Sequence, residues 1–164
     1  MYKRQEFELV ISKIAWMNKG VTINSSVQTP ILSYSNINTS FYTDELKTAS
    51  ANGSSLGLTE KVYVVTTVTN NGNVTWNNAN NAIWFKTDDP RDRLSEFCDP
   101  AWSSCSRLTP MNESIVAPGE TATFEFWWEA PRTKTGNYNE HFRLVMSKVA
   151  WLSGPDIVIN TLVQ

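Results

Sequence analysis

The sequence contains the same pair of strand-like segments twice, 135 residues apart. FELVISKIAW at 7–16 reappears as FRLVMSKVAW at 142–151. After a one-residue insertion the match continues, with INSSVQ at 23–28 against INTLVQ at 159–164. A copy spacing of domain size is typical of a tandem array of domains. We therefore expect one whole repeat preceded by the tail of an earlier repeat, cut from a longer protein.

The repeat predicts three segments. Residues 1–28 are the C-terminal strand pair of the preceding repeat, and about five residues at the start resemble a non-native cloning remnant. Residues 29–58 are rich in Ser, Thr and Asn, which indicates a connector and a first edge strand. Residues 59–164 would form the domain body. Its stretch 88–114 is a long insertion, and binding residues often lie in such insertions.

Most periodic segments alternate apolar and polar residues, which predicts strands. Turn sequences such as Asn71-Gly72 and Pro118-Gly119 separate them. One short helix is expected at 43–51. Many short strands without alternating helices indicate an all-β protein, an immunoglobulin-like sandwich of two antiparallel sheets with an extra N-terminal strand pair. The expected strands are 61–69, 82–86, 121–129, 138–146 and 156–163.

Strand parity and turn position predict the aromatic core. Gly136-Asn137-Tyr138 fits a tyrosine corner, in which the ring packs in the core and the hydroxyl holds the preceding loop. Trp76 follows a tight turn and can close one end of the sandwich. The predicted core residues are Trp76, Phe124, Phe126, Trp128, Tyr138, Phe142 and Trp151.

Composition excludes two classes of partner. The net charge is −2 and no basic block occurs, which argues against nucleic-acid binding. The apolar runs are too short for a membrane span. Only 18% of residues are charged, while small polar residues abound, a composition common in exported β-proteins. Cys98 and Cys105 then suit a local disulfide, with two free thiols as the alternative.

Four segments in a fixed order together cover about 59–164. They are VTNNGNVTW at 68–76, VAPGETATF at 116–124, Ala130-Pro131 with Gly136-Asn137-Tyr138, and FRL at 142–144 with Trp151. In this order they resemble the Nbr1-type immunoglobulin-like domains, also called four-tryptophan domains. The resemblance implies an immunoglobulin-like sandwich without enzymatic activity. It implies cargo binding in eukaryotic autophagy receptors, and modules of exported or cell-surface proteins in bacteria and archaea.

No catalytic, metal or cofactor constellation is evident. His141 is the only histidine, and strand parity places it on the outer face. The acidic stretch 88–93 could attract Ca²⁺, but its interleaved arginines favour a charged turn. Glu125 and Glu129 share a strand face about 13 Å apart, farther than a glycosidase pair.

Three tryptophans are candidate ligand-binding or partner-binding residues. Parity places Trp84 and Trp127 on outward faces, and Trp102 lies in the expected cysteine loop. Exposed aromatic rings often dominate binding energy. The alternative is that each ring packs under the 88–114 insertion or against a neighbouring repeat.

The leading hypothesis is a non-catalytic extracellular module, a spacer or adhesion domain of a bacterial or archaeal cell-surface protein. Its expected partners are neighbouring repeats, and a cell-surface protein or glycan. The alternative is a carbohydrate-binding appendage of a secreted hydrolase, with Trp84, Trp102 and Trp127 as sugar platforms. An enzyme in its own right is a third hypothesis that no residue pattern favours.

Overall fold

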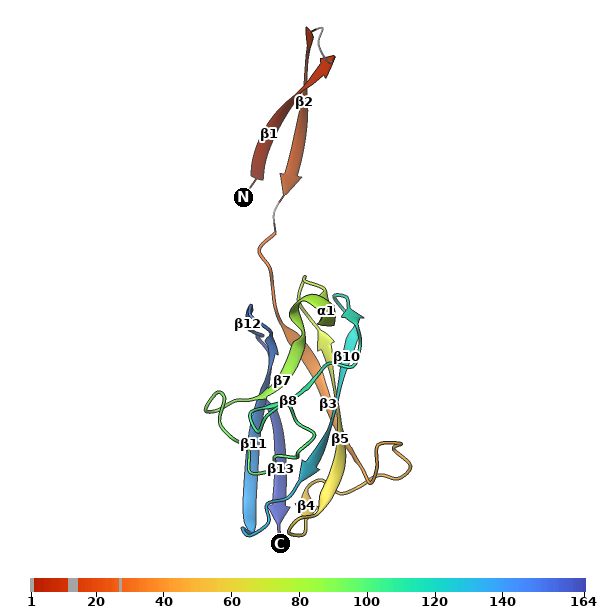
Figure 1. The fold of residues 1–164 in the computed structure, drawn as a ribbon, viewed down its shortest axis with the longest axis vertical. Helices are drawn as coiled ribbons and strands as arrows, with labels where there is room; N and C mark the ends of the chain where they lie inside the picture. The colour runs from red at the N-terminus through yellow and green to blue at the C-terminus, as the bar shows by residue number, and fades with distance from the viewer. Residues whose placement is uncertain (1, 12–14, 27) are drawn as a thin grey trace. The chain divides into compact units, whose positions relative to one another are not determined.

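The computed structural model describes residues 2–11, 15–26 and 28–164, so residues 12–14 and 27 of the predicted strand pair lie outside it. The chain divides into two compact units, Met1–Pro30 and Ile31–Gln164. In the first unit, β1 (Tyr2–Ile11) and β2 (Ala15–Ser26) form an antiparallel hairpin (Figure 1). All other elements belong to the second unit.

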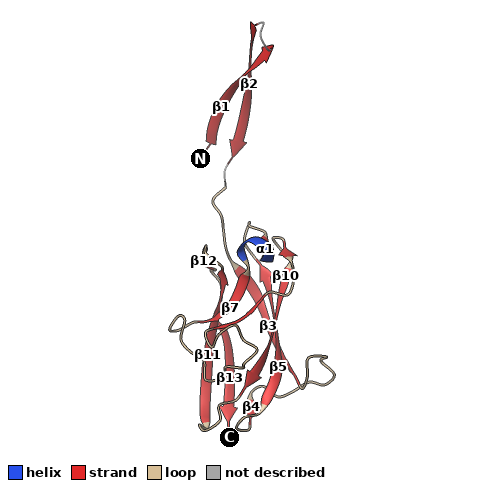
Figure 2. Cartoon of the chain, viewed as in Figure 1, coloured by secondary structure: helices blue, strands red, loops and turns tan. Residues whose placement is uncertain are grey.

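The second unit is a sandwich of two main sheets, as predicted (Figure 2). The first sheet is antiparallel, with the strand order β10-β5-β3. Its strands are β3 (Tyr34–Tyr42), β5 (Lys61–Asn70) and β10 (Thr121–Glu129). The strand β3 lies at an edge, within the segment predicted to supply a first edge strand.

The second sheet has the order β4-β13-β11-β7-β8, and β12 (Ala150–Trp151) pairs with β11 beside this path. Only the pair β13–β4 is parallel. The path runs through β4 (Ser55–Leu56), β13 (Ile157–Val163), β11 (Gly136–Met146), β7 (Ile83–Thr87) and β8 (Arg107–Pro110). A ribbon of β6 (Trp76–Asn77) and β9 (Ile115–Val116), with the one-turn helix α1 (Asn78–Asn81), completes the elements.

Alternating side chains of the two sheets meet in an aromatic core. The Phe85 ring lies 5.6 Å from Phe124 of the facing sheet and 5.1 Å from Phe142 of its own sheet, measured between centroids. Burying such rings is the main source of stability for a sandwich. Among the predicted core residues, Trp76, Phe124, Phe126, Trp128 and Phe142 are buried.

The tyrosine corner is confirmed. The Tyr138 ring packs against the core, with an edge contact to Phe97 at 5.1 Å. Its hydroxyl donates to the Lys134 carbonyl at 3.2 Å, four residues upstream. The ring therefore anchors the start of β11, and the hydroxyl holds the turn before it.

Two predictions about local structure are wrong. Residues 43–51 form bends and turns instead of a helix. The Asp44 carboxylate accepts bonds from the Thr43 and Thr48 hydroxyls, and such side-chain bonds compete with helical ones. Trp151 is only half-buried on the sheet edge, because β12 carries it outside the core, where Lys86 and Arg91 cover its ring.

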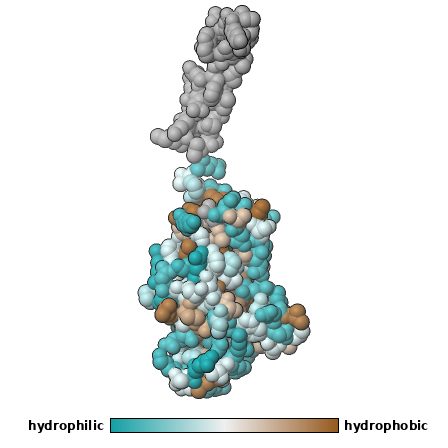
Figure 3. Space-filling view, viewed as in Figure 1, coloured by the Kyte–Doolittle hydropathy of each residue, from teal (hydrophilic) through white to brown (hydrophobic). Residues whose placement is uncertain are grey.

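The insertion after β7 contributes to the core as well as to the surface. The Phe97 ring stacks on Trp128 at a centroid distance of 4.2 Å and an interplanar angle of 11°. Cys98 and Cys105 form the predicted disulfide, with their Cα atoms 4.9 Å apart. The bridge closes a loop that lies over the edge of the sandwich. On the face shown in Figure 3, hydrophobic side chains occur as scattered spots on a mostly polar surface.

Candidate functional site

The three candidate tryptophans lie at two places. Trp84 lies on the outer face of β7, half-buried, as parity predicted. The Arg107 guanidinium lies 3.8 Å from its ring centroid, within the range of a cation–π contact. This cation therefore covers one face of the Trp84 ring.

Trp127 lies on the outer face of β10 in a cluster of polar and aromatic groups. Its indole Nε1 donates to Glu45 at 2.7 Å. Tyr63 makes an edge contact at 5.2 Å, and the Lys61 ammonium lies 4.7 Å from the ring centroid. Glu45, Tyr63 and Trp127 border a cavity of about 140 Å³, whose lining also includes Trp102 and Glu125.

Two side chains that line this cavity have shifted pKa values, Tyr63 and Glu125. Burial raises the pKa of the Tyr63 hydroxyl to about 12, and the neighbouring Glu125 carboxylate adds to the shift. Burial also acts to raise the pKa of Glu125, but its hydrogen bonds, chiefly from Lys47, outweigh burial and hold that pKa below its usual range. The cavity thus presents a charged carboxylate beside two aromatic rings at neutral pH.

Trp102 is not exposed, which corrects the prediction. Only 6% of this residue is accessible, and its ring lies 6.0 Å from Phe126 and 6.2 Å from Trp128. Its Nε1 donates to the Trp127 carbonyl at 2.7 Å, on the outer edge of β10. The disulfide loop turns the ring inward, where it covers that edge. Trp102 and Trp127 therefore share one cavity, whereas Trp84 belongs to the other sheet.

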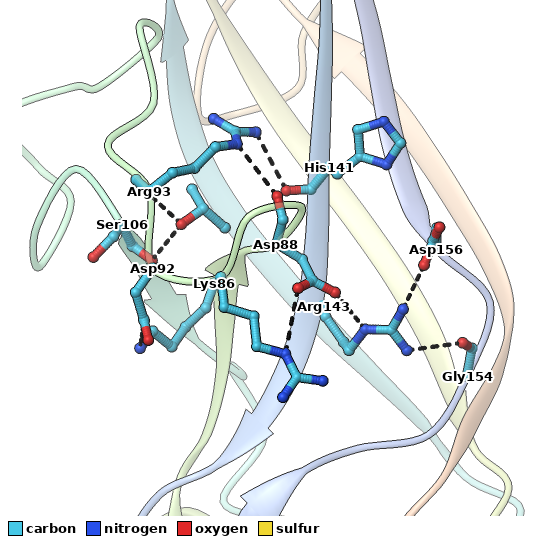
Figure 4. Close-up of polar contacts among 11 residues, drawn as sticks. Lys86, Asp88, Asp92, Arg93, Ser106, His141, Arg143, Gly154 and Asp156 are labelled. Carbon is cyan, nitrogen blue, oxygen red and sulfur yellow. Dashed lines mark hydrogen bonds and ion pairs between the residues drawn. The ribbon is translucent and has the colours of Figure 1, made fainter.

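Charged side chains of the acidic stretch 88–93 are paired across the second sheet (Figure 4). The Arg143 guanidinium donates to Asp88 at 2.6 Å and to Asp156 at 2.5 Å. Burial acts to raise the pKa of Asp88, but the bond from Arg143 and further donors leave that pKa lowered. These pairs fit the charged-turn interpretation. His141 lies half-buried on the outward side of β11, as parity placed it.

Sequence reasoning did not single out Glu140 as functional or structural. It is only 6% exposed and accepts bonds from Arg93 at 2.8 Å and Ser95 at 2.7 Å. Two charge-assisted hydrogen bonds compensate for burying a carboxylate. The signal was available, because Glu140 has the same strand parity as Phe142.

A second hollow was also missed. It lies on the outer face of the second sheet, has a volume of about 250 Å³, and is lined by Lys86, Arg107, Val145, Ser147 and Lys148. Three of these five residues are cations from different elements, so only the folded sheet brings them together.

No group of three or more His, Cys, Asp or Glu side chains suited to a metal occurs among the residues that the structure describes. Within the same residues, no helix is long and apolar enough to cross a membrane.

Comparisons with known proteins find matches among solved structures alone. No family model and no curated protein matches the chain. One of the matching solved structures is a family 123 glycoside hydrolase of Clostridium perfringens, whose description concerns glycolipid glycan hydrolysis. The sequence identity is 11%, the TM-score is 0.32, and the match covers 77% of this chain. It covers 26% of the hydrolase chain, so this chain spans about a quarter of that length.

Proposed function

We propose that this chain is a non-catalytic extracellular module of a tandem array of Nbr1-type, immunoglobulin-like domains. In this array, the hairpin β1–β2 completes a sandwich whose body precedes it. The observation that carries the proposal is the identical pairing register of the two hairpins.

The registers agree along the hairpin. Phe7 pairs with Val21, and the equivalent residues Phe142 and Ile157 pair in the second unit. Nearer the turn, Val10 pairs with Trp16, as Val145 pairs with Trp151. A one-residue slip would exchange the two faces of a hairpin, so a shared register means shared faces.

The shared register predicts a shared buried face. In the second unit, Phe142, Leu144, Met146, Ile157 and Ile159 are all buried in the core. The equivalent positions in the first hairpin are Phe7, Leu9, Ile11, Val21 and Ile23, all apolar. An isolated hairpin is at best marginally stable in water. We infer that this apolar pattern is matched to a sandwich body like that formed by residues 31–135.

Three observations support the immunoglobulin-like and extracellular parts of the proposal. The orders β10-β5-β3 and β13-β11-β7 correspond to the E-B-A and G-F-C orders of immunoglobulin sheets. The tyrosine corner at Tyr138 is a further feature of that fold. The disulfide Cys98–Cys105 fits an oxidising compartment.

The proposal is tested by adding a second body. Residues 31–135 are fused directly before residue 1, because residue 1 is equivalent to residue 136. Two folded sandwiches are expected, seen as a doubled set of dispersed amide resonances in NMR spectra. Leu9→Asp should unfold the added body alone, whereas Glu8→Gln, at an outward register position, should not. An added body that stays unfolded in the parent fusion would overturn the proposal.

The cavity beside Trp127 favours one alternative, a carbohydrate-binding appendage. The Trp127 ring could stack on a sugar, and the neighbouring carboxylates of Glu45 and Glu125 could accept hydrogen bonds from the sugar hydroxyls. Polysaccharide pull-down with Trp127→Ala tests it, with Trp151→Ala as a control ring elsewhere on the surface. Retention of the polysaccharide by both variants would exclude this cavity as the binding site.

A further inference from the structure

The hollow on the outer face of the second sheet is positively charged. Lys86 comes from β7, Arg107 from β8, and Lys148 from the turn after β11. One carboxylate lies close, since Asp92 pairs with Lys86. Arg91 adds a further cation nearby, over the Trp151 ring that Lys86 also approaches, and it pairs with Asp88 at 3.5 Å. The local balance is therefore cationic in a chain whose net charge is −2.

The Arg107 side chain is fixed by two contacts, yet one of its N–H donors has no acceptor. Its guanidinium lies on Trp84, and its Nη2 donates to the Ser147 hydroxyl oxygen at 2.9 Å. The Nε atom is buried and has no hydrogen-bond partner in the structure. A buried guanidinium N–H without an acceptor is costly and needs a reason. An acceptor that binds in the hollow would supply that reason, once a shift of the Arg107 side chain uncovers this N–H.

Lys148 has an unfavourable backbone conformation. Its φ is 61°, in the left-handed region that favours Gly or Asn over a long side chain. Among the described residues, no hydrogen bond or ion pair of its ammonium is found. A lysine at a left-handed turn position, without a structural partner, is explained if its charge is needed there.

Three of the residues that line the hollow lie within the internal repeat. Val145, Ser147 and Lys148 have identical counterparts in the first copy, Val10, Ser12 and Lys13. Ser12 and Lys13 lie outside the described residues, so this comparison rests on sequence alone. Other outward positions of the hairpin have changed between the copies, namely His141 against Glu6, Arg143 against Glu8, and Val158 against Thr22. The three lining residues that fall within the repeat are thus the same in both copies, whereas these outward positions differ.

We propose that this hollow binds a tetrahedral oxyanion, a sulfate or phosphate group. The Arg107 Nε, the Lys148 ammonium and the Ser147 hydroxyl supply the donors, and Lys86 adds charge. Cationic and hydroxyl donors around one small hollow are the usual chemistry for such groups. The group could be a free ion or one carried by a saccharide, and the same donors would recognise both.

The test uses the full chain and follows the Arg107 Nε–H resonance by NMR during titration with sodium sulfate or sodium phosphate at constant ionic strength. A saturable shift confined to this hollow is expected. Matched sulfated and unsulfated oligosaccharides form a second arm. Tighter binding of the sulfated one than of inorganic sulfate assigns the group to a saccharide, and binding of inorganic sulfate alone assigns a free ion.

Substitution of Lys148 distinguishes a binding role from a structural one. Lys148→Gly relieves the left-handed strain, so we expect a more stable protein that binds sulfate about tenfold more weakly. Lys134→Gln removes an exposed cation that pairs with Glu96, and it should leave binding unchanged. The proposal fails if Lys148→Gly binds sulfate as tightly as the parent chain. It also fails if Lys134→Gln weakens binding equally, or if no saturable shift occurs.

Discussion

Replacing Trp102 by alanine measures how far the disulfide loop belongs to the core. Only 6% of Trp102 is exposed, and its Nε1 donates a hydrogen bond to the Trp127 carbonyl on the outer edge of β10. Truncating a buried tryptophan costs about 3–5 kcal/mol of unfolding free energy. A domain of this size has about 5–15 kcal/mol in total. We therefore expect Trp102→Ala to remain folded at low temperature but to melt roughly 6–20 °C lower.

A second variant separates packing from hydrogen bonding. Trp102→Phe keeps an aromatic ring but leaves the Trp127 carbonyl without its donor, so the expected loss is about 1–3 kcal/mol. Trp151→Ala serves as the surface control, with an expected loss of about 1 kcal/mol or less, because cations cover its half-buried ring.

Urea unfolding followed by tryptophan fluorescence and by circular dichroism gives all three free energies. The order Trp102→Ala, Trp102→Phe, Trp151→Ala, from largest to smallest loss, supports the packing described above. A loss below about 1 kcal/mol for Trp102→Ala, with an unchanged dependence on urea, would refute it. Trp102 would then be free to act as the ligand platform that its sequence position indicated.

Three other outcomes are expected. Replacing both Cys98 and Cys105 by serine should lower the unfolding free energy by about 2–3 kcal/mol, measured by urea unfolding against the oxidised parent chain. The pKa of Asp88 is lowered in the folded state, so its stabilisation is complete above the unfolded value of about 4 and is lost as the pH falls through the folded-state pKa. Arg143→Gln should therefore weaken the fall of the unfolding free energy with decreasing pH below about pH 4. The same fall in the variant and the parent chain would contradict this. Burial raises the pKa of Tyr34 to about 12, so ionisation of the unfolded chain should weaken folding above about pH 10. In a titration followed by tyrosinate absorbance, Tyr34→Phe should lack one of the tyrosines that ionise only at high pH in the parent chain.

The strands and most of the core could be predicted because local alternation determines them. Phe124, Phe126 and Trp128 alternate with polar residues on β10, and that period leaves one buried face. Trp151 lies outside every strand that alternation predicts, and the strand it occupies, β12, is only two residues long and lies off the main path of the sheet. Parity has no meaning in a strand that short.

The contents of the insertion could not be predicted in the same way. Phe97 and Trp102 lie in loops, where no period assigns a face, and their burial depends on how the disulfide folds the segment back. The basic hollow depends on the pairing register of β7, β8 and β11, which brings its cationic side chains together. Lys86 and Arg107 pair across β7 and β8, and that pairing is set by the tertiary fold rather than by local sequence.

The position of β13 has a mechanical consequence. This strand lies between the parallel β4 and the antiparallel β11, and Gln164 still donates its backbone N–H to Leu56. A force that pulls on Gln164 along the strand acts across the hydrogen bonds on both edges. Those bonds are then sheared together instead of being opened one after another. The hydrogen bonds to β4 and to β11 must therefore break together before tension at the C-terminal end can pull β13 out of the sheet.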